Sequence, residues 1–292
     1  GSVVKAPYPH SENIPAGMSH EQYVEYCLWH LDSHIPEYIV PSENIAAVLI
    51  EPGLAEGGNW IPSGNFIKGI RKICDKHGWL MIADEVLTGL GRTAEMWGMD
   101  HYKVIPDMLI VGKNLSGGIA PCAGVATRDE ILGNNPSASS GSTFAGTPAG
   151  CAAGLKTLEI YKRDKVIDHA KKLAQIAKLR MEPWCEKYSI VSETRQLGLL
   201  MGISFNLPDS LASSDKYDDS FVARTVRDYM LRNGVWAICD SESTVRMYPA
   251  LNMDENVFRE AFDIIEDAII KVESGSELVG DYPAIPTGVT GF

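Results

Sequence analysis

The sequence of 292 residues has no apolar run long enough to cross a membrane, a length of about 18 residues. It also has no block of lysine and arginine, and its formal net charge is −12. A surface of this sign repels nucleic acid and anionic lipid. These absences argue against DNA, RNA or a membrane as the main partner.

Paired cysteine motifs are missing too. The six cysteines are scattered, at positions 27, 74, 122, 151, 185 and 239, and none of them forms a Cys-x-x-Cys pair. We therefore predict no metal site, and we expect free buried thiols in a reducing compartment, the cytoplasm.

A starting methionine is absent as well. The chain opens with Gly-Ser and continues as an extended segment broken by prolines, as though in the middle of a protein. We expect a fragment of a longer protein, or a cloning remnant at its start.

The first half of the sequence alternates short apolar runs with amphipathic helical patterns. Strands are predicted at 45–51, 79–84, 107–112 and 122–127, with a helix over 63–78. Continuous apolar strands separated by helices indicate an α/β fold with a parallel sheet covered on both faces. Chemistry in such sheets gathers at the carboxyl ends of the strands.

The second half has a different pattern, in which helices and strands follow an α+β order. Helices are predicted at 149–162, 164–187, 218–233 and 254–272, and strands at 189–196, 197–205, 235–239 and 244–248. We predict a large domain over 1–162, a smaller one over 163–272 and an irregular tail over 273–292.

Two charged residues end neighbouring apolar strands. Asp84 closes 79–84, and Lys113 follows 107–112. Singly, Asp84 could be a turn residue and Lys113 a solvated loop residue; together they could form an ion pair. Alternatively they bracket a ligand with a cationic ring nitrogen and an aldehyde, which describes pyridoxal phosphate. Ser142 and Thr143, in a glycine-rich turn before a helix, could then bind its phosphate.

Five segments occur in the order and spacing typical of one family. They are EPGLAEGG (51–58), IADEVLTGLGRT (82–93), VGKNLSGG (111–118), GSTFAGTPAGCAAGLKTLE (141–159) and VRMYPALNMDENVF (245–258). The sequence resembles the class III pyridoxal-phosphate-dependent aminotransferases over about residues 3 to 272. The resemblance implies fold type I, with a mainly parallel large domain and a smaller α+β domain.

The resemblance also implies how the cofactor is held. Asp84 would pair with the pyridine nitrogen, and Lys113 would be the internal-aldimine lysine and the proton-shuttling base. Val86 would pack on the ring, and Glu51 would close its strand nearby. Thr143, with Ser142 beside it, would bind the phosphate across the interface of a homodimer with shared active sites.

For the substrates, an amine or amino acid and a 2-oxo acid, the resemblance implies a pair of opposite charges. Arg246 would grip the substrate carboxylate, and Glu56 would hold that arginine aside when no α-carboxylate is present. The alternatives are a salt-bridged strand arginine for Arg246 and a solvated turn acid for Glu56.

Three departures from the family pattern qualify these expectations. Leu87 stands where ornithine and 4-aminobutyrate aminotransferases carry glutamine, which favours the amine:pyruvate side of the family. Thr147 replaces the usual Asn or His. A phosphate-binding Ser-Gly turn and a ring-stacking aromatic residue, expected upstream, have no obvious equivalent in residues 1–45.

The leading functional prediction is a ping-pong aminotransferase. One alternative within the same scaffold is an amino-acid racemase or epimerase. The other alternative is a non-catalytic truncated or split fragment that needs its missing N-terminal part.

Overall fold

The structure is a computed structural model that describes residues 3–132, 143–208, 218–239 and 243–276. The chain forms two compact units, each described here by itself. Unit 1 comprises Gly1–Lys178, Arg195–Gly202 and Met247–Met253, and unit 2 comprises Leu179–Thr194, Ile203–Arg246 and Asp254–Phe292. Whether 1–162 and 163–272 behave as separate domains remains a prediction.

Unit 1 is built on a four-stranded sheet with strand order β1-β2-β3-β4. The strands are β1 (Ala47–Ile50), β2 (Leu80–Asp84), β3 (Met108–Val111) and β4 (Gly124–Thr127). All four lie within the predicted segments. β1, β2 and β3 run parallel, and α3 (Gly64–His77) makes the crossover from β1 to β2. The carboxyl ends of these three strands therefore share one edge of the sheet.

The mainly parallel sheet that was predicted is confirmed for β1, β2 and β3, whereas β4 pairs antiparallel with β3. A parallel return needs a long crossover, usually through a helix. Residues 112–123 contain only a short 3-10 turn, Lys113–Ser116, ended by Gly117 in the left-handed conformation. This turn reverses the chain at once, so β4 comes back beside β3 in the opposite direction.

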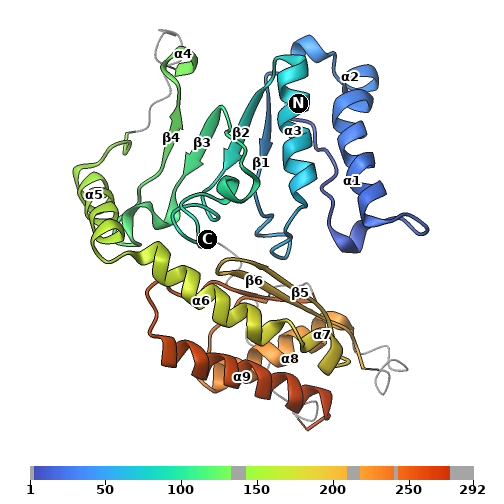
Figure 1. Ribbon diagram of the computed structural model, residues 1–292, viewed down its shortest axis with the longest axis vertical. Coiled ribbons are helices and arrows are strands. Elements are labelled where there is room, and N and C mark those ends of the chain that lie inside the picture. Colours follow the sequence, from blue (N-terminus) through green and yellow to red (C-terminus); the bar gives the residue numbers. More distant parts are fainter. Residues whose placement is uncertain (1–2, 133–142, 209–217, 240–242, 277–292) are drawn as a thin grey trace. The chain divides into compact units, whose positions relative to one another are not determined.

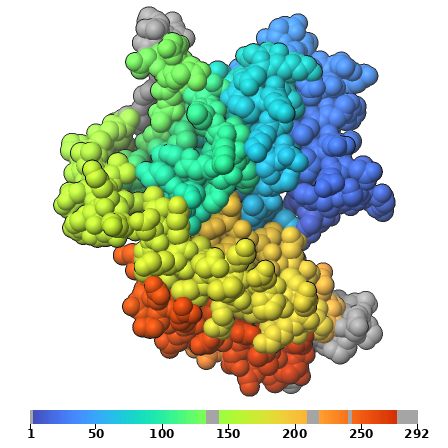
Figure 2. Space-filling model, viewed as in Figure 1, coloured from blue at the N-terminus to red at the C-terminus, as the bar shows by residue number. Residues whose placement is uncertain are grey.

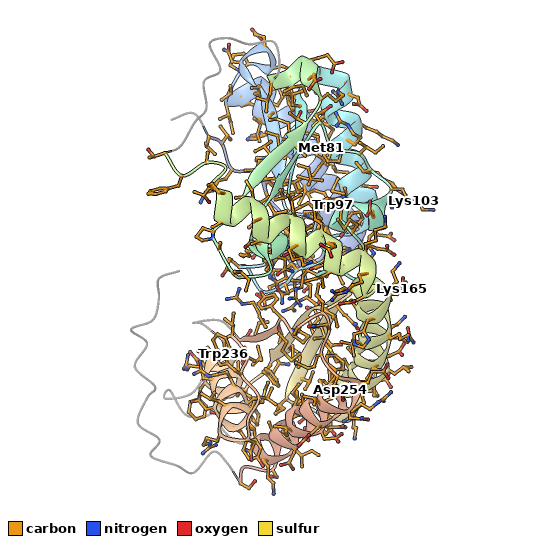
Figure 3. The ribbon with its side chains drawn as sticks, turned by 90° about the vertical axis from the view of Figure 1, so that its left-hand side faces the viewer. Met81, Trp97, Lys103, Lys165, Trp236 and Asp254 are labelled. Atoms are coloured by element: carbon orange, nitrogen blue, oxygen red, sulfur yellow. The ribbon has the colours of Figure 1, made fainter. Side chains whose placement is uncertain are left out.

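Helix α3 is amphipathic and packs between the sheet and α1, which spans His20–Trp29 (Figure 1). The amphipathic pattern predicted for this helix is confirmed, because its apolar residues are buried: Phe66, Ile67, Ile70 and Ile73. Met81, labelled in Figure 3, is fully buried in the same core. Burying each such side chain contributes about 1.5–3 kcal/mol. A π-helical turn at His30–His34 joins α1 to α2 (Ile35–Tyr38).

The other face of the sheet is not covered as predicted within the described residues. Leu49 is 61% exposed and Val125 is 49% exposed. The register pairs Leu49 with Ile82 and Ile82 with Met108, and it pairs Asp84 with Ile110 and Ile110 with Val125. Alternation along a strand puts these residues on the face opposite Met81. This half-exposed apolar face thus includes Asp84.

Helices follow β4 along the chain. They are α4 (Asp129–Leu132), α5 (Pro148–Arg163), α6 (Val166–Met181) and α7 (Trp184–Lys187). α5 packs against the Lys113–Ser116 turn and lies at the surface, in yellow-green in Figure 2. The single long helix predicted over 164–187 is wrong. It is split before Pro183, because proline lacks an amide hydrogen and clashes with the preceding turn.

The second sheet has strand order β5-β6-β7. Its strands are β5 (Val191–Leu197), β6 (Leu200–Phe205) and β7 (Thr244–Met247). In unit 2, α8 (Asp219–Arg232) packs against α9 (Glu255–Glu273). The strand predicted at 235–239 is reduced to one bridge between Ile238 and Arg246. The predicted tail lies outside the described residues from 277 onward.

All six cysteines are free thiols. Cys27, Cys74 and Cys239 are buried as predicted, but Cys151 and Cys185 are exposed. Cys151 is exposed because α5 turns that side outward. None of the described helices is both long and apolar enough to cross a bilayer.

Candidate active site

Three of the predicted site residues meet at the shared edge of the unit 1 sheet. Glu51 follows β1, Asp84 ends β2, and Lys113 comes two residues after β3. The parallel register of β1, β2 and β3 brings these positions to one side of the sheet. Sequence-distant charges are thereby gathered into one cluster.

Glu51 is the most informative member of this cluster. Its Oε2 accepts a hydrogen bond of 3.0 Å from the backbone N–H of Ala55. Burial raises the pKa of the Glu51 carboxyl, the Ala55 hydrogen bond opposes this, and the charges of Asp84, Lys113 and Glu56 also act on it. Asp84 and Glu56 raise the pKa, whereas Lys113 lowers it. The other three predicted charged residues of unit 1 therefore lie close enough to Glu51 to act on its carboxyl.

Asp84 is held in one orientation by its own turn. Its Oδ1 accepts a hydrogen bond of 3.0 Å from the Val86 N–H. This is the turn role expected for an aspartate after a strand, and it uses one of the two carboxylate oxygens. Val86 lies beside Gly112, whose Cβ position would be 3.4 Å from Val86 Cγ1. Asp84 and Val86 thus lie next to the segment that carries Lys113.

Lys113 is exposed, which is the surrounding of a solvated loop residue. The Lys113 backbone has φ of +40°, a left-handed conformation unusual for a residue with a side chain. Such conformations persist only where the surroundings impose them, and they cluster at functional sites.

Glu85, the neighbour of Asp84, was not singled out from the sequence, yet it is fully buried. Its carboxylate accepts hydrogen bonds from Thr88 Oγ1 at 2.5 Å, Gly98 N at 2.9 Å and Met99 N at 2.8 Å. Burial raises the Glu85 pKa, and these three hydrogen bonds oppose the shift. Glu85 therefore anchors the segment after β2 to residues 98–99. An acid doublet after an apolar strand was the only signal for this role.

The start of the segment after β1 is fixed by two tyrosines that were also missed. Tyr8 donates to the Glu51 carbonyl at 3.4 Å, and Tyr102 donates to the Pro52 carbonyl at 2.7 Å. Burial raises the pKa of both hydroxyls, so they stay protonated and act as donors. Isolated tyrosines carry no sequence signal for such a role.

The other predicted site residues are Ser142, Thr143 and Arg246. Ser142 lies outside the described residues. Thr143 is exposed in the turn that precedes α5. Arg246 belongs to unit 2, where it is 3% exposed and pairs through its backbone with Ile238 at 2.7 and 3.0 Å. Leu87 is half-buried.

The chemistry of the cluster fits a ligand with a cationic nitrogen and a carbonyl group. The carboxyl groups of Asp84 and Glu56 and the primary amine of Lys113 all lie close enough to Glu51 to act on its pKa. A carboxylate beside a ring nitrogen favours its protonated form, and a primary amine can bond to an aldehyde. The residues present therefore fit pyridoxal phosphate at its ring nitrogen and its aldehyde.

A model of the class-III aminotransferase family matches residues 1–269, most of the chain. The chain belongs to the class-III aminotransferase family. It is 29% identical over 266 residues to a probable 4-aminobutyrate aminotransferase of Bacillus subtilis, covering 90% of this chain and 60% of the relative. It is 30% identical over 277 residues to a leucine/methionine racemase of Thermococcus litoralis, covering 94% of this chain and 60% of the relative.

Solved structures agree with this class-III aminotransferase assignment. An amine transaminase from an uncultivated Pseudomonas species is similar with a TM-score of 0.75 and 25% identity, covering 86% of this chain and 57% of that one. That structure is in a form with pyridoxal phosphate bound, the cofactor predicted from the sequence. The predicted α/β fold of type I is confirmed. The chain spans about 60% of the length of the curated relatives named here.

Proposed function

We propose that the protein transfers an amino group from an amine or amino acid to a 2-oxo acid, with pyridoxal 5'-phosphate as cofactor. The observation that carries this proposal is the convergence of Glu51, Asp84 and Lys113 at one edge of a parallel sheet. Membership of the class-III family supports the same reaction. The transfer would follow a ping-pong order, because donor and acceptor use one site in turn.

Each residue of the cluster would have a separate task. Asp84, already oriented by the Val86 N–H, would hold the cofactor ring nitrogen in its protonated form. Lys113 would bind the cofactor covalently and move a proton at the substrate carbon that bears the nitrogen. When bound, the cofactor supplies an electron-withdrawing ring that stabilises negative charge at that carbon. Val86 would pack on the ring, and Glu51 would lie nearby.

Other proposed contacts extend beyond the cluster. Ser142 and Thr143 would bind the cofactor phosphate, Thr143 from the partner subunit of a homodimer. Arg246 would bind a substrate carboxylate through two parallel hydrogen bonds, the geometry that suits a guanidinium. Glu56 would hold Arg246 aside for donors without an α-carboxylate. The free thiols support a reducing location, which we propose is the cytoplasm.

An amine-donor screen tests the proposal. Pyruvate and 2-oxoglutarate serve as acceptors, and Lys113→Ala is the control variant. We expect turnover with at least one donor and none above background in Lys113→Ala. Turnover retained in that variant would rule out the assigned role of Lys113.

Racemisation is a second candidate, favoured by the similarity to a leucine/methionine racemase over 94% of this chain. A racemase needs no 2-oxo acid, because it returns the proton to the opposite face of the same carbon. Incubation of L-leucine without an acceptor separates the two reactions. Appearance of D-leucine would favour the racemase, and consumption of the amine only with an acceptor would favour the transferase.

A further inference from the structure

The loop 54–60, which carries Glu56, is a small closed hairpin. Leu54 and Trp60 exchange two backbone hydrogen bonds, of 2.9 and 3.0 Å. Inside the loop, the amides of Gly58 and Asn59 both donate to the Ala55 carbonyl at 3.1 Å. The exposed Glu56 therefore stands on a closed backbone ring rather than on an open connection.

The returning side of this hairpin, at residues 58–59, has an unusual backbone conformation. Gly58 has φ of +117° and Asn59 has φ of +57°. A Cβ atom at position 58 would lie 2.9 Å from Trp60 Nε1, so only glycine fits there. Asparagine tolerates the left-handed conformation better than most residues do. Two such residues in succession require support from outside the loop.

Asn59 supplies part of that support through its fully buried side chain. Its Nδ2 donates to the Met201 carbonyl at 2.6 Å, and its Oδ1 accepts from the Tyr248 hydroxyl at 2.8 Å. The amide thus uses a donor and its acceptor oxygen at once. Buried polar groups satisfied in this way fix the geometry of the backbone that carries them.

Arg195 supplies the remaining support for the backbone at residues 58–59. Its guanidinium lies over the Trp60 ring, 3.7 Å from the ring centroid. Its Nε and Nη2 donate to the Gly58 carbonyl at 3.1 and 2.9 Å. Arg195 is only 6% exposed, so water does not compete strongly for these contacts. The Gly58 carbonyl and the Asn59 side chain are therefore both held by hydrogen bonds to residues distant in sequence.

We infer that Asn59, Arg195 and Tyr248 are positioning residues that fix the loop 54–60 and thereby set the orientation of Glu56. The inference rests on the proposed role of Glu56 as the acid that holds Arg246 aside. If the loop that carries Glu56 had to become ordered when the substrate binds, its loss of conformational entropy would weaken binding. A preorganised loop avoids this cost. These three residues would then determine how well donors without an α-carboxylate are accepted.

Hydrogen exchange tests the positioning step on the protein with cofactor added. Tyr248→Phe removes one hydroxyl and keeps the ring. Tyr161→Phe is the matched control, because the Tyr161 hydroxyl donates to the Leu90 carbonyl at the same distance of 2.8 Å. We expect Tyr248→Phe to accelerate amide exchange at 58–60 about fivefold, the effect of one lost hydrogen bond. Exchange in this loop should not change in Tyr161→Phe.

Steady-state kinetics test the specificity step. The donors are 1-phenylethylamine, which has no carboxylate, and L-alanine, with 2-oxobutyrate as the common acceptor. In Tyr248→Phe we expect kcat/KM for 1-phenylethylamine to fall about fivefold while that for L-alanine changes less than about twofold. Asn59→Gly, which keeps the left-handed backbone but removes both side-chain hydrogen bonds, should change the ratio in the same direction.

The outcomes separate this inference from the proposed function. Amide exchange at 58–60 that is as slow in Tyr248→Phe as in the wild type would overturn the positioning role. Faster exchange with equal losses for the two donors would overturn the specificity role. A wild-type protein that converts no donor of the amine screen contradicts the proposed function and the specificity role together, while the exchange result still decides on the positioning role alone.

Discussion

Asp84 and Glu85 are adjacent in the sequence, but their carboxyl groups have opposite surroundings. Glu85 is fully buried and accepts three hydrogen bonds, from Thr88, Gly98 and Met99. Asp84 is half-buried, uses one oxygen for the Val86 N–H, and lies on the open face of the sheet. Successive side chains of a strand point to opposite faces, so one acid secures the fold while the other faces the site.

Replacement of Glu85 should cost stability. In Glu85→Gln an amide NH2 replaces one carboxylate oxygen. At least one of the donors on Thr88, Gly98 and Met99 then loses its acceptor. We expect the free energy of unfolding to fall by about 1–3 kcal/mol, the cost of a buried donor left without an acceptor. Urea denaturation measures it, and Asp84→Asn is the control. An equal loss in both variants would show that the two acids are not distinct.

Replacement of Asp84 should cost activity instead. Asp84→Asn removes the charge that would keep the cofactor ring nitrogen protonated. We expect kcat/KM to fall at least about a hundredfold, because an unprotonated ring withdraws electrons less strongly, with little change in the free energy of unfolding. Steady-state kinetics with the best donor of the screen measure it. Near wild-type turnover would mean that Asp84 is only a turn residue.

Much of the sheet could be predicted because its strands are short runs of apolar residues between clear breaks. The antiparallel β4 could not, since strand direction depends on whether a crossover fits between 111 and 124, not on the strand residues themselves. Exposure of Leu49 was equally unpredictable. A continuous run of apolar residues is typical of a strand covered on both faces. The run itself does not show which elements of the described chain cover it.

A test of pH dependence is offered by Asp107. Burial alone would raise its pKa, but hydrogen bonds from the Met81 N–H, Arg71 and Arg128 hold the pKa at about 2, below the usual 3.8. A depressed pKa stabilises the fold above the unfolded-state value, and this contribution disappears as the pH falls through the folded-state value.

The difference in unfolding free energy between the wild type and Asp107→Asn should therefore be constant above about pH 5 and shrink from about pH 4 to pH 2. Urea denaturation across this range measures the difference. A difference that stays constant down to pH 2 would mean that the carboxylate makes no ionic contribution.

A steric prediction concerns Gly198, in the turn between β5 and β6. Its φ is +63°, and a Cβ atom there would lie 2.0 Å from the carbonyl carbon of Thr93. We expect Gly198→Ala to destabilise by more than about 4 kcal/mol. Gly78→Ala, at φ of +72° with no neighbouring atom within 4 Å, should cost only about 1 kcal/mol. Similar melting curves for the two variants would contradict this packing.

The candidate site was predictable where a residue type carries chemistry by itself. Asp84 and Lys113 stand out as charges at strand ends, and the structure brings both near Glu51. Asn59 and Arg195 were missed, because a buried amide and a stacked guanidinium reveal their roles only through partners distant in sequence. Contacts over such sequence distances have no local signature.

The central claim is that the edge formed by β1, β2 and β3 is the cofactor site, with Lys113 as the attachment point. Pyridoxal 5'-phosphate is added to the protein, the bound cofactor is fixed with borohydride, and peptide mass spectrometry identifies the modified lysine. We predict that Lys113 carries the label and that labelling there falls in Asp84→Asn. Labelling spread over other lysines, or none at Lys113, would contradict the account.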